Sequence, residues 1–281
     1  MSSSRPRTEA KRRAFRELHA AGTFVIPNPW DLGSARLLQH LGFAALASTS
    51  SGLSWSNGQA DYSLELPIAL DHLQGLCAAV DLPISADFEE GFAREPEDVA
   101  RNVARVLQTG VAGLSIEDTQ VEDATLLYEL GLAVERIRAA RAAITTAAPD
   151  VVLVARTELL LHQPQALTRA IDKLVAFADA GADCLFAPGV YARQDIVAMV
   201  RAVAPKPLNV LMAKPGLTVA ELADLGVRRV SVGGALARVA WAAMLEAATQ
   251  LRAGSFEGLG RAASGAELNA IFASFGDETS P

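Results

Sequence analysis

Short apolar runs recur eight times along the chain, and segments of helical composition separate them. The runs cover residues 23–27, 44–48, 83–86, 112–116, 151–155, 184–186, 207–210 and 229–232. Several of the intervening segments end at a glycine, such as Gly42, Gly110, Gly181 or Gly226, which can stop a helix in the left-handed conformation. This alternation is typical of a parallel α/β sheet. Eight such units predict an α/β fold of the (β/α)8 TIM-barrel type.

The chain length is consistent with one barrel and a short addition. A (β/α)8 barrel takes roughly 250 residues, and this chain has 281, so we expect a single domain over residues 1–281. Two helical stretches, 235–253 and 266–274, follow the last apolar run, although a barrel needs one helix there. We therefore expect residues 255–281 to form a C-terminal helical extension that covers the barrel or packs on another subunit.

Composition excludes several classes of partner. The net charge of −7 argues against a nucleic-acid partner, which would favour a basic face. No apolar run approaches the roughly 20 residues of a membrane span, and the first residues lack the apolar region of a secretory signal. We expect no membrane partner and a cytoplasmic location. Cys77 and Cys184 have no metal-ligand spacing and are expected to be buried thiols.

Polar and small residues follow most of the apolar runs. A parallel barrel gathers the carboxyl ends of its strands on one rim, where such barrels build their active sites. The residues at these ends include four acids, one arginine, one tryptophan and several small or amide side chains, namely Asn28, Trp30, Asp31, Ser50, Ser51, Gly52, Asp87, Glu117, Asp118, Arg156 and Asn209. The pattern predicts an enzyme with one pocket at this rim.

The acids of the rim have two interpretations. Asp87, Glu117 and Asp118, with Asp61 in the loop after the second run, would repel each other unless they share a cation or a proton. A divalent cation such as Mg²⁺ would satisfy them. Alternatively, they cap helices or pair with Arg94, Arg101 and Arg105. Arg156 could hold a carboxylate or phosphonate through two parallel hydrogen bonds, or form an ion pair with Glu117 or Glu158.

Five strings, each at a strand end, resemble the isocitrate lyase/phosphoenolpyruvate mutase superfamily, in its phosphoenolpyruvate mutase-like branch. They are residues 27–36 (PNPWDLGSAR), 50–53 (SSGL), 86–87 (AD), 113–118 (GLSIED) and 154–157 (VART). Each string alone is a weak signal. The five occur in the family's order, and the resemblance extends over nearly the whole chain, from about residue 12 to about residue 275.

The resemblance implies a Mg²⁺-dependent enzyme, with Mn²⁺ as a possible substitute. Its substrate would be a small carboxylic or phosphonic acid, a keto or hydroxy acid or a phosphonate analogue. The reaction would make or break a C–C or P–C bond next to a carbonyl through an enolate-like intermediate. By this resemblance, Asp61, Asp87 and Glu117 serve the metal, and Arg156, Asp31 and Glu117 are catalytic. The expected substrate-binding residues are Trp30, Ser50, Ser51, Gly52, Leu53, Arg156 and Asn209. Family members also assemble as homo-oligomers that exchange the last helix, so a dimer or tetramer is expected.

Two departures from the family pattern narrow the reaction. The family motif at the third strand has an additional acid where this chain has Ser85. The loop at residues 119–128 lacks the cysteine, lysine, histidine and asparagine of the lyases and the mutase, which argues against a true isocitrate lyase. Oxaloacetate decarboxylation, phosphonopyruvate hydrolysis and cleavage of a substituted malate stay open. Tyr128 is a packing residue or a proton donor. A barrel that binds a carboxylic acid without turning it over is the alternative outside enzymes.

Overall fold

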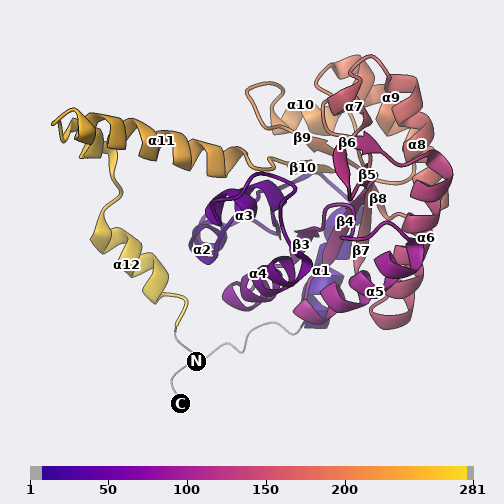
Figure 1. The fold of residues 1–281 in the computed structure, drawn as a ribbon, viewed down its shortest axis with the longest axis horizontal. Helices are drawn as coiled ribbons and strands as arrows, with labels where there is room; N and C mark the ends of the chain where they lie inside the picture. Colours follow the sequence, from indigo (N-terminus) through magenta and orange to yellow (C-terminus); the bar gives the residue numbers. More distant parts are fainter. Residues whose placement is uncertain (1–7, 277–281) are drawn as a thin grey trace.

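The computed structural model describes residues 8–276, and within this range eight parallel strands form one sheet (Figure 1). Its order is β1-β10-β9-β8-β7-β4-β3-β2. The strands are β1 (Phe24–Ile26), β2 (Leu46–Ala47), β3 (Ile84–Asp87), β4 (Gly113–Glu117), β7 (Val152–Arg156), β8 (Cys184–Phe186), β9 (Leu208–Leu211) and β10 (Arg229–Ser231). Each overlaps one of the eight apolar runs, so the predicted strands are confirmed.

The first and last strands of this order also meet. The backbone amide of Ala47 in β2 donates to the carbonyl of Pro27, just after β1, at 3.1 Å. This contact brings the two edges together and makes the sheet a nearly closed barrel. The predicted (β/α)8 barrel is therefore confirmed.

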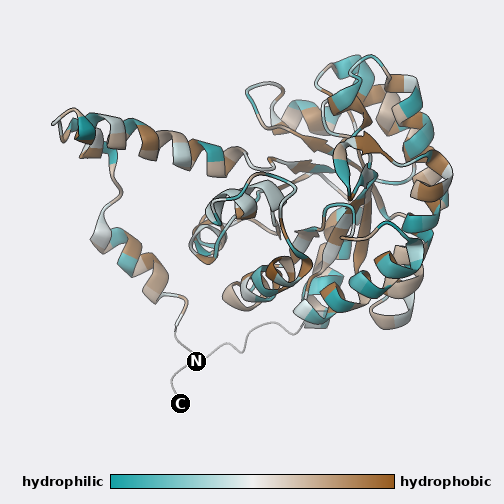
Figure 2. Cartoon of the chain, in the orientation of Figure 1, coloured by the Kyte–Doolittle hydropathy of each residue, from teal (hydrophilic) through white to brown (hydrophobic). Residues whose placement is uncertain are grey.

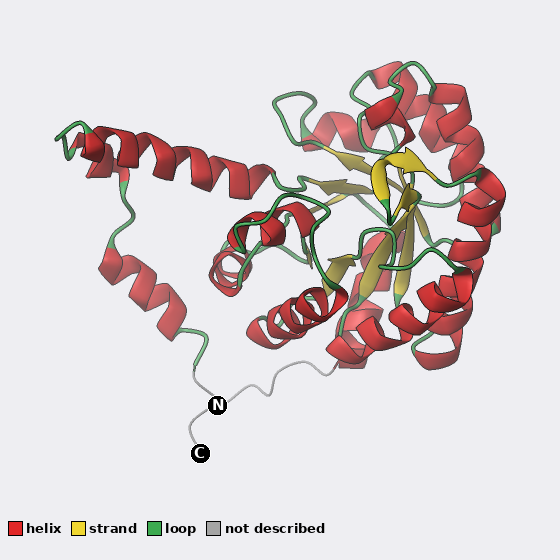
Figure 3. Ribbon diagram, viewed as in Figure 1, coloured by secondary structure: helices red, strands yellow, loops and turns green. Residues whose placement is uncertain are grey.

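Helices surround the sheet (Figure 3). They are α2 (Leu32–His40), α3 (Ser50–Ser56), α4 (Leu66–Ala79), α5 (Pro96–Val106), α6 (Leu130–Ala147), α7 (Leu159–His162), α8 (Leu167–Asp179), α9 (Arg193–Val203) and α10 (Val219–Asp224), with a short 3-10 helix at Leu107–Thr109. The largest apolar cluster lies between their inner faces and the outer face of the sheet, where Val103, Leu114, Ile137 and Leu153 are buried. This packing is the main source of burial in a (β/α)8 fold.

The helix α1 (Thr8–Ala20) closes the amino end of the barrel. Phe15 is fully buried in a second apolar cluster with Phe24, Ile26 and Val152. Arg12 donates to the carbonyl of Val111 at 3.0 Å, just before β4. Since α1 covers this end, the interior is accessible from the carboxyl ends of the strands.

The segment after β4 is a hairpin. Strands β5 (Thr119–Gln120) and β6 (Asp123–Leu127) pair antiparallel. Tyr128 follows them and is buried, with its hydroxyl accepting from the amide of Val121 at 3.3 Å and its ring 4.4 Å from the guanidinium of Arg136. These contacts give Tyr128 a packing role.

The C-terminal helices extend away from the barrel. In Figure 1, α11 (Ala235–Arg252) projects outward and α12 (Gly265–Ala273) turns back, with the 3-10 helix η2 (Glu257–Arg261) between them. Ala237 is the buried residue of α11, and the described part of α12 has none. Figure 2 shows hydrophobic stretches along both helices. Residues 277–281 of the predicted extension lie outside the described residues. Within residues 8–276 no helix is long and apolar enough to cross a membrane.

Candidate functional site

A polar cavity of about 160 Å³ opens at the carboxyl ends of the barrel strands. Its charged side chains are Asp61, Asp87, Arg156 and Arg229. Its neutral polar side chains are those of Asn28, Ser48, Thr49, Ser50, Ser51, Tyr62, Ser115, Asn209 and Ser231. This size and lining suit a small polar molecule rather than an apolar one.

Asp87 is held by hydrogen bonds on both carboxylate oxygens. The backbone amide and the hydroxyl of Ser50 each lie 2.9 Å from Oδ2, and Arg156 Nη1 lies 3.3 Å from Oδ1. The Asp87 amide donates to the hydroxyl of Ser48 at 2.8 Å. Asp87 ends β3 and Ser50 begins α3, so the end of one strand and the start of a helix fix this carboxylate facing the cavity.

Arg156 is surrounded by carboxylates. Its Nε contacts Glu158 and lies 3.2 Å from Glu117 Oε2, and Nη1 reaches Asp87. Arg156 and Glu117 are register partners on β7 and β4, which explains their contact. Burial, opposed by the charge of Arg156, raises the pKa of Glu117 to about 8. Three acids around one guanidinium leave an excess of negative charge beside the cavity.

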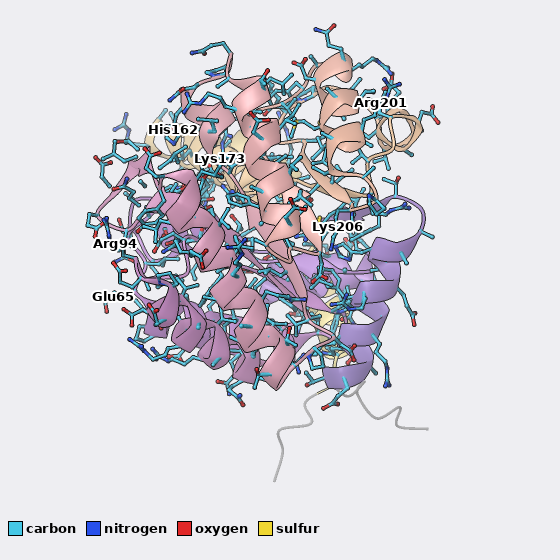
Figure 4. The ribbon with its side chains drawn as sticks, turned by 90° about the vertical axis from the view of Figure 1, so that its right-hand side faces the viewer. Glu65, Arg94, His162, Lys173, Arg201 and Lys206 are labelled. Carbon is cyan, nitrogen blue, oxygen red and sulfur yellow. The ribbon has the colours of Figure 1, made fainter. Side chains whose placement is uncertain are left out.

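Asp118 lies outside the cavity and holds the residues around Arg156 in position through hydrogen bonds. Its carboxylate accepts from the hydroxyl of Thr157 at 2.7 Å, the amide of Glu158 at 2.9 Å and Lys173 Nζ at 2.7 Å. Lys173 comes from α8 and lies near His162, with which it lines a separate surface hollow (Figure 4). Asp118 is buried and does not line the main cavity. It positions Glu158 and, through Glu158, Arg156.

Asp61 and Tyr62 reach the cavity from the loop between α3 and α4. Loss of hydration and then the charge of Asp87 raise the pKa of Asp61. Tyr62 has a left-handed backbone with φ of 59°, which is uncommon for a bulky residue. Burial followed by the charge of Glu117 raises the pKa of Tyr62. The acids at the strand ends therefore help to raise the pKa values of both residues.

Several residues predicted for the site lie beside the cavity rather than on its surface. The Asp31 carboxylate caps α2 by accepting from the amide of Ser34 at 2.6 Å. Gly52 is packed behind the wall, where an added Cβ would lie 2.9 Å from the Cβ of Trp30. Leu53 lines a small adjoining hollow with Ser50 and Asp87. Within the described residues, the predicted side chains that line the main cavity are those of Ser50, Ser51, Asp61, Asp87, Arg156 and Asn209.

Sequence reasoning assigned no catalytic, substrate-binding or metal-binding role to some of the cavity residues. Asn28 Oδ1 accepts from the amides of Val232 and Gly233 at 3.0 and 2.8 Å, and its Nδ2 donates to the carbonyl of Ser48 at 2.9 Å. It thereby ties the carboxyl ends of β1, β2 and β10 together, and its place at a strand end was a signal. Arg229 begins β10, so a rule based on strand ends could not have found it.

The acid side chains near the cavity decide whether the metal expected from the resemblance could bind there. No group of three or more His, Cys, Asp or Glu side chains in residues 8–276 is arranged to hold a metal ion. Glu117 has both oxygens engaged, by Thr119 and Arg156, and does not line the cavity. Asp61 and Asp87 do line it. Mg²⁺ commonly uses one or two carboxylates and completes its shell with waters and substrate oxygens, so these two acids fit Mg²⁺.

The fold and the cavity define a class of protein: a (β/α)8 barrel with a polar, acid-rich pocket at the carboxyl ends of its strands. Residues 15–252 match the family model described as phosphoenolpyruvate phosphomutase. The chain belongs to this family, within the isocitrate lyase/phosphoenolpyruvate mutase superfamily, and the predicted resemblance is confirmed.

Named relatives cover most of the chain. An uncharacterized protein of Mycobacterium tuberculosis is 35% identical over 95% of this chain and 99% of its own length. A solved structure from Burkholderia cenocepacia, whose name proposes a lyase or mutase, is 46% identical with a TM-score of 0.91, over 95% of this chain and 97% of that one. The structure of 2,3-dimethylmalate lyase is 30% identical with a TM-score of 0.83, over 94% and 93%. Similarity to lyases and mutases supports an enzyme.

Proposed function

We propose that this chain is an enzyme that makes or breaks a C–C or P–C bond next to the carbonyl of a small keto or hydroxy acid. The reaction would pass through an enolate-like intermediate. The observation that carries the proposal is the Asp87–Arg156 pair, which faces a small polar cavity at the strand ends of a barrel of this family. Buried, oriented charges of this kind are what stabilisation of a charged intermediate requires.

The uncharged polar side chains that line the cavity would orient the substrate. The hydroxyls of Ser50 and Ser51 and the amide of Asn209 face the cavity, and they can hydrogen-bond to carboxylate or carbonyl oxygens. Asn209 already donates to Ser231 Oγ at 3.0 Å, while its Oδ1 has no partner among the described residues. Trp30, Gly52 and Leu53 would act by shaping the wall behind these donors.

Asp61 and Asp87 would hold Mg²⁺, or Mn²⁺ in its place. Glu117 would contribute to the metal site indirectly, through its contact with Arg156. The bound cation would stabilise the negative oxygen that develops on the carbonyl. Arg156 would hold the side chains of Asp87 and Glu117 in position. Asp31 would influence the site through the position of α2, whose amino end it caps. Residues 119–128 contain no cysteine, lysine, histidine or asparagine, so the proton that quenches the enolate would come from water.

Release of pyruvate from a panel of acids tests this proposal. Decarboxylation of oxaloacetate, hydrolysis of phosphonopyruvate, and cleavage of methylisocitrate or dimethylmalate all yield pyruvate, so one coupled assay covers the four. Each acid would be supplied with Mg²⁺ and again after removal of divalent cations. We expect metal-dependent pyruvate from one member. No product from any of them, together with no heat of Mg²⁺ binding, would instead favour a barrel that binds an acid without turnover.

The exposed apolar surface of the C-terminal helices supports a homo-oligomer, a dimer or a tetramer. Val239, Leu245 and Phe256 are 67%, 61% and 75% exposed, and they lie on or beside the projecting α11. A helix with a large unpartnered apolar surface is typical of an interface between subunits. We propose that α11 and α12 pack on another copy of the chain.

A further inference from the structure

Arg229 is a buried cation at the floor of the cavity. It begins β10, is 5% exposed, and is among the residues that line the cavity. Its Nη2 lies 3.3 Å from the hydroxyl of Ser85, and its guanidinium lies 5.9 Å from the ring centre of Phe15. The Nε and Nη1 atoms have no hydrogen-bond partner in the described part of the chain. A buried guanidinium in this condition is costly unless an anion pairs with it.

The groups around Arg229 do not neutralise it. Among residues 8–276 no carboxylate lies within ion-pair distance of its nitrogens, and Asp87 acts on it only through longer-range attraction. The neighbouring thiol of Cys184 has a pKa raised to about 11 by burial, so it is uncharged at neutral pH. Ser85, whose hydroxyl accepts from Arg229, is also uncharged.

The contrast with Arg156 is informative. Arg156 contacts Asp87, Glu117 and Glu158, so its positive charge is already matched by protein carboxylates. Arg229 lines the same cavity, and its Nε and Nη1 atoms are buried without a hydrogen-bond partner among the described residues. An aspartate at position 85 would pair with Arg229 across the 3.3 Å contact, whereas the serine leaves the positive charge available. Of the two arginines, Arg229 is therefore the one able to take an external anion.

We propose that Arg229 is a substrate-binding residue, whose guanidinium holds one carboxylate or phosphonate group of the small acid at the cavity floor. Arginine suits such a group because it can form two parallel charge-assisted hydrogen bonds with it. The inference rests on the proposed function in one respect, namely that the cavity takes a small anionic acid. It adds that this anion is bound by a cation of the chain itself, so part of the binding survives without a divalent metal ion.

The test measures oxalate binding by titration calorimetry in buffer stripped of divalent cations. Oxalate is a small dianion, and it requires no turnover. We expect the wild-type chain to bind it and Arg229→Met to bind it at least about tenfold more weakly, because charge-assisted hydrogen bonds are lost. Arg229→Lys should fall between the two. The matched control is Arg228→Met, since this adjacent arginine donates to the carbonyl of Gly22 at the exposed amino end of the barrel.

Ser85→Asp provides a second variant that keeps Arg229 in place. The new carboxylate would neutralise the guanidinium, so oxalate affinity should again fall at least about tenfold, while the unfolding temperature is unchanged or higher. This variant decides the question if Arg229→Met does not fold. Wild-type affinity for oxalate in Ser85→Asp or in folded Arg229→Met, or no oxalate binding by the wild type, would overturn the inference. Oxalate binding that depends on Arg229, without pyruvate from any acid of the panel, would reject the proposed reaction and leave the inference standing.

Discussion

Arg156 Nη1 lies 3.3 Å from Asp87 Oδ1, an ion pair that spans β4 and connects the ends of β7 and β3. Glu117, at the end of the intervening β4, contacts the same guanidinium at 3.2 Å. The three neighbouring strand ends are thereby joined by one buried cation. Arg156 therefore stabilises the barrel, in addition to any part in the reaction.

Removal of the Arg156 charge should destabilise the barrel. In Arg156→Ala the carboxylates of Asp87, Glu117 and Glu158 would face each other without a cation, at a cost of about 3–5 kcal/mol in the free energy of unfolding. Uncompensated buried acids have raised pKa values and bind protons in the folded state, so the stability lost relative to Arg156→Lys should be smaller at pH 5.5 than at pH 7.5. Urea unfolding at both pH values measures this. Arg156→Lys, which keeps the charge, is the control, and equal stability of the two variants at pH 7.5 would contradict the account.

His19 should make stability depend on acidity. Burial and then the charge of Arg229 lower its pKa to about 4, so the folded chain keeps this histidine neutral. Between pH 6.5 and 4 the unfolded chain binds a proton that the folded chain does not, and stability must therefore fall as the pH falls. From pH 7 to pH 5 this loss amounts to roughly 2 kcal/mol. His19→Leu should remove it in urea unfolding, whereas His40→Gln, at an exposed position, should keep the wild-type dependence. Identical pH profiles for His19→Leu and wild type would refute the assignment.

Gly113 permits α1 to close the barrel. A Cβ at this position would lie 2.5 Å from Phe15 Cε1 and 3.1 Å from the carbonyl oxygen of Val152, and neither can move freely in the packed interior. Gly113→Ala should lower the free energy of unfolding by about 1–3 kcal/mol. Gly131→Ala is the control, because nothing lies within 4 Å of its added methyl in α6, where alanine gains up to about 1 kcal/mol. Thermal unfolding compares the two, and equal effects would show that the close contact at Gly113 carries no cost.

The projecting C-terminal helices should set the oligomeric state. Light scattering on the eluted protein should give a mass at least twice the 29.6 kDa of one chain. Leu245→Glu combined with Phe256→Glu should shift it toward the monomer, since both side chains are exposed on the projecting segment. Leu161→Glu, at a leucine that is 50% exposed on α7, should leave the mass unchanged. A monomeric wild type would reject the proposed interface.

Strand periodicity carried most of the predicted fold, because each apolar run is buried on both faces of a parallel sheet. The same reasoning placed Ser50, Asp87 and Arg156 at one cavity, since they stand at the carboxyl ends of strands, whereas Asn209 lies within β9 as the register partner of Arg229. Asp31 also follows a strand, but its short carboxylate binds the amide of Ser34 three residues later. The position in the sequence does not show whether such a side chain points into the cavity or caps the following helix.

The remaining cavity residues could not be predicted from the sequence, because their places at the cavity depend on the length of a side chain or the course of a loop. Arg229 stands at the amino end of β10, and only its long side chain brings the guanidinium to Ser85 and the cavity. Tyr62 lies in a loop whose left-handed backbone has no clear sequence signal. The hairpin of β5 and β6 could not be predicted from periodicity, because its five-residue second strand is largely exposed.

The central claim is that the cavity around Asp87 and Arg156 is an active site. Its most direct test is pyruvate release by Asp87→Asn, with the acid of the panel that the wild type consumes. The substitution preserves size and removes the charge held by Ser50 and Arg156. We predict at least about a 100-fold loss of kcat/KM with an unfolding temperature close to that of wild type. The control Asp224→Asn, on the exposed face of α10, should keep full activity. Turnover by Asp87→Asn within twofold of wild type would contradict the claim.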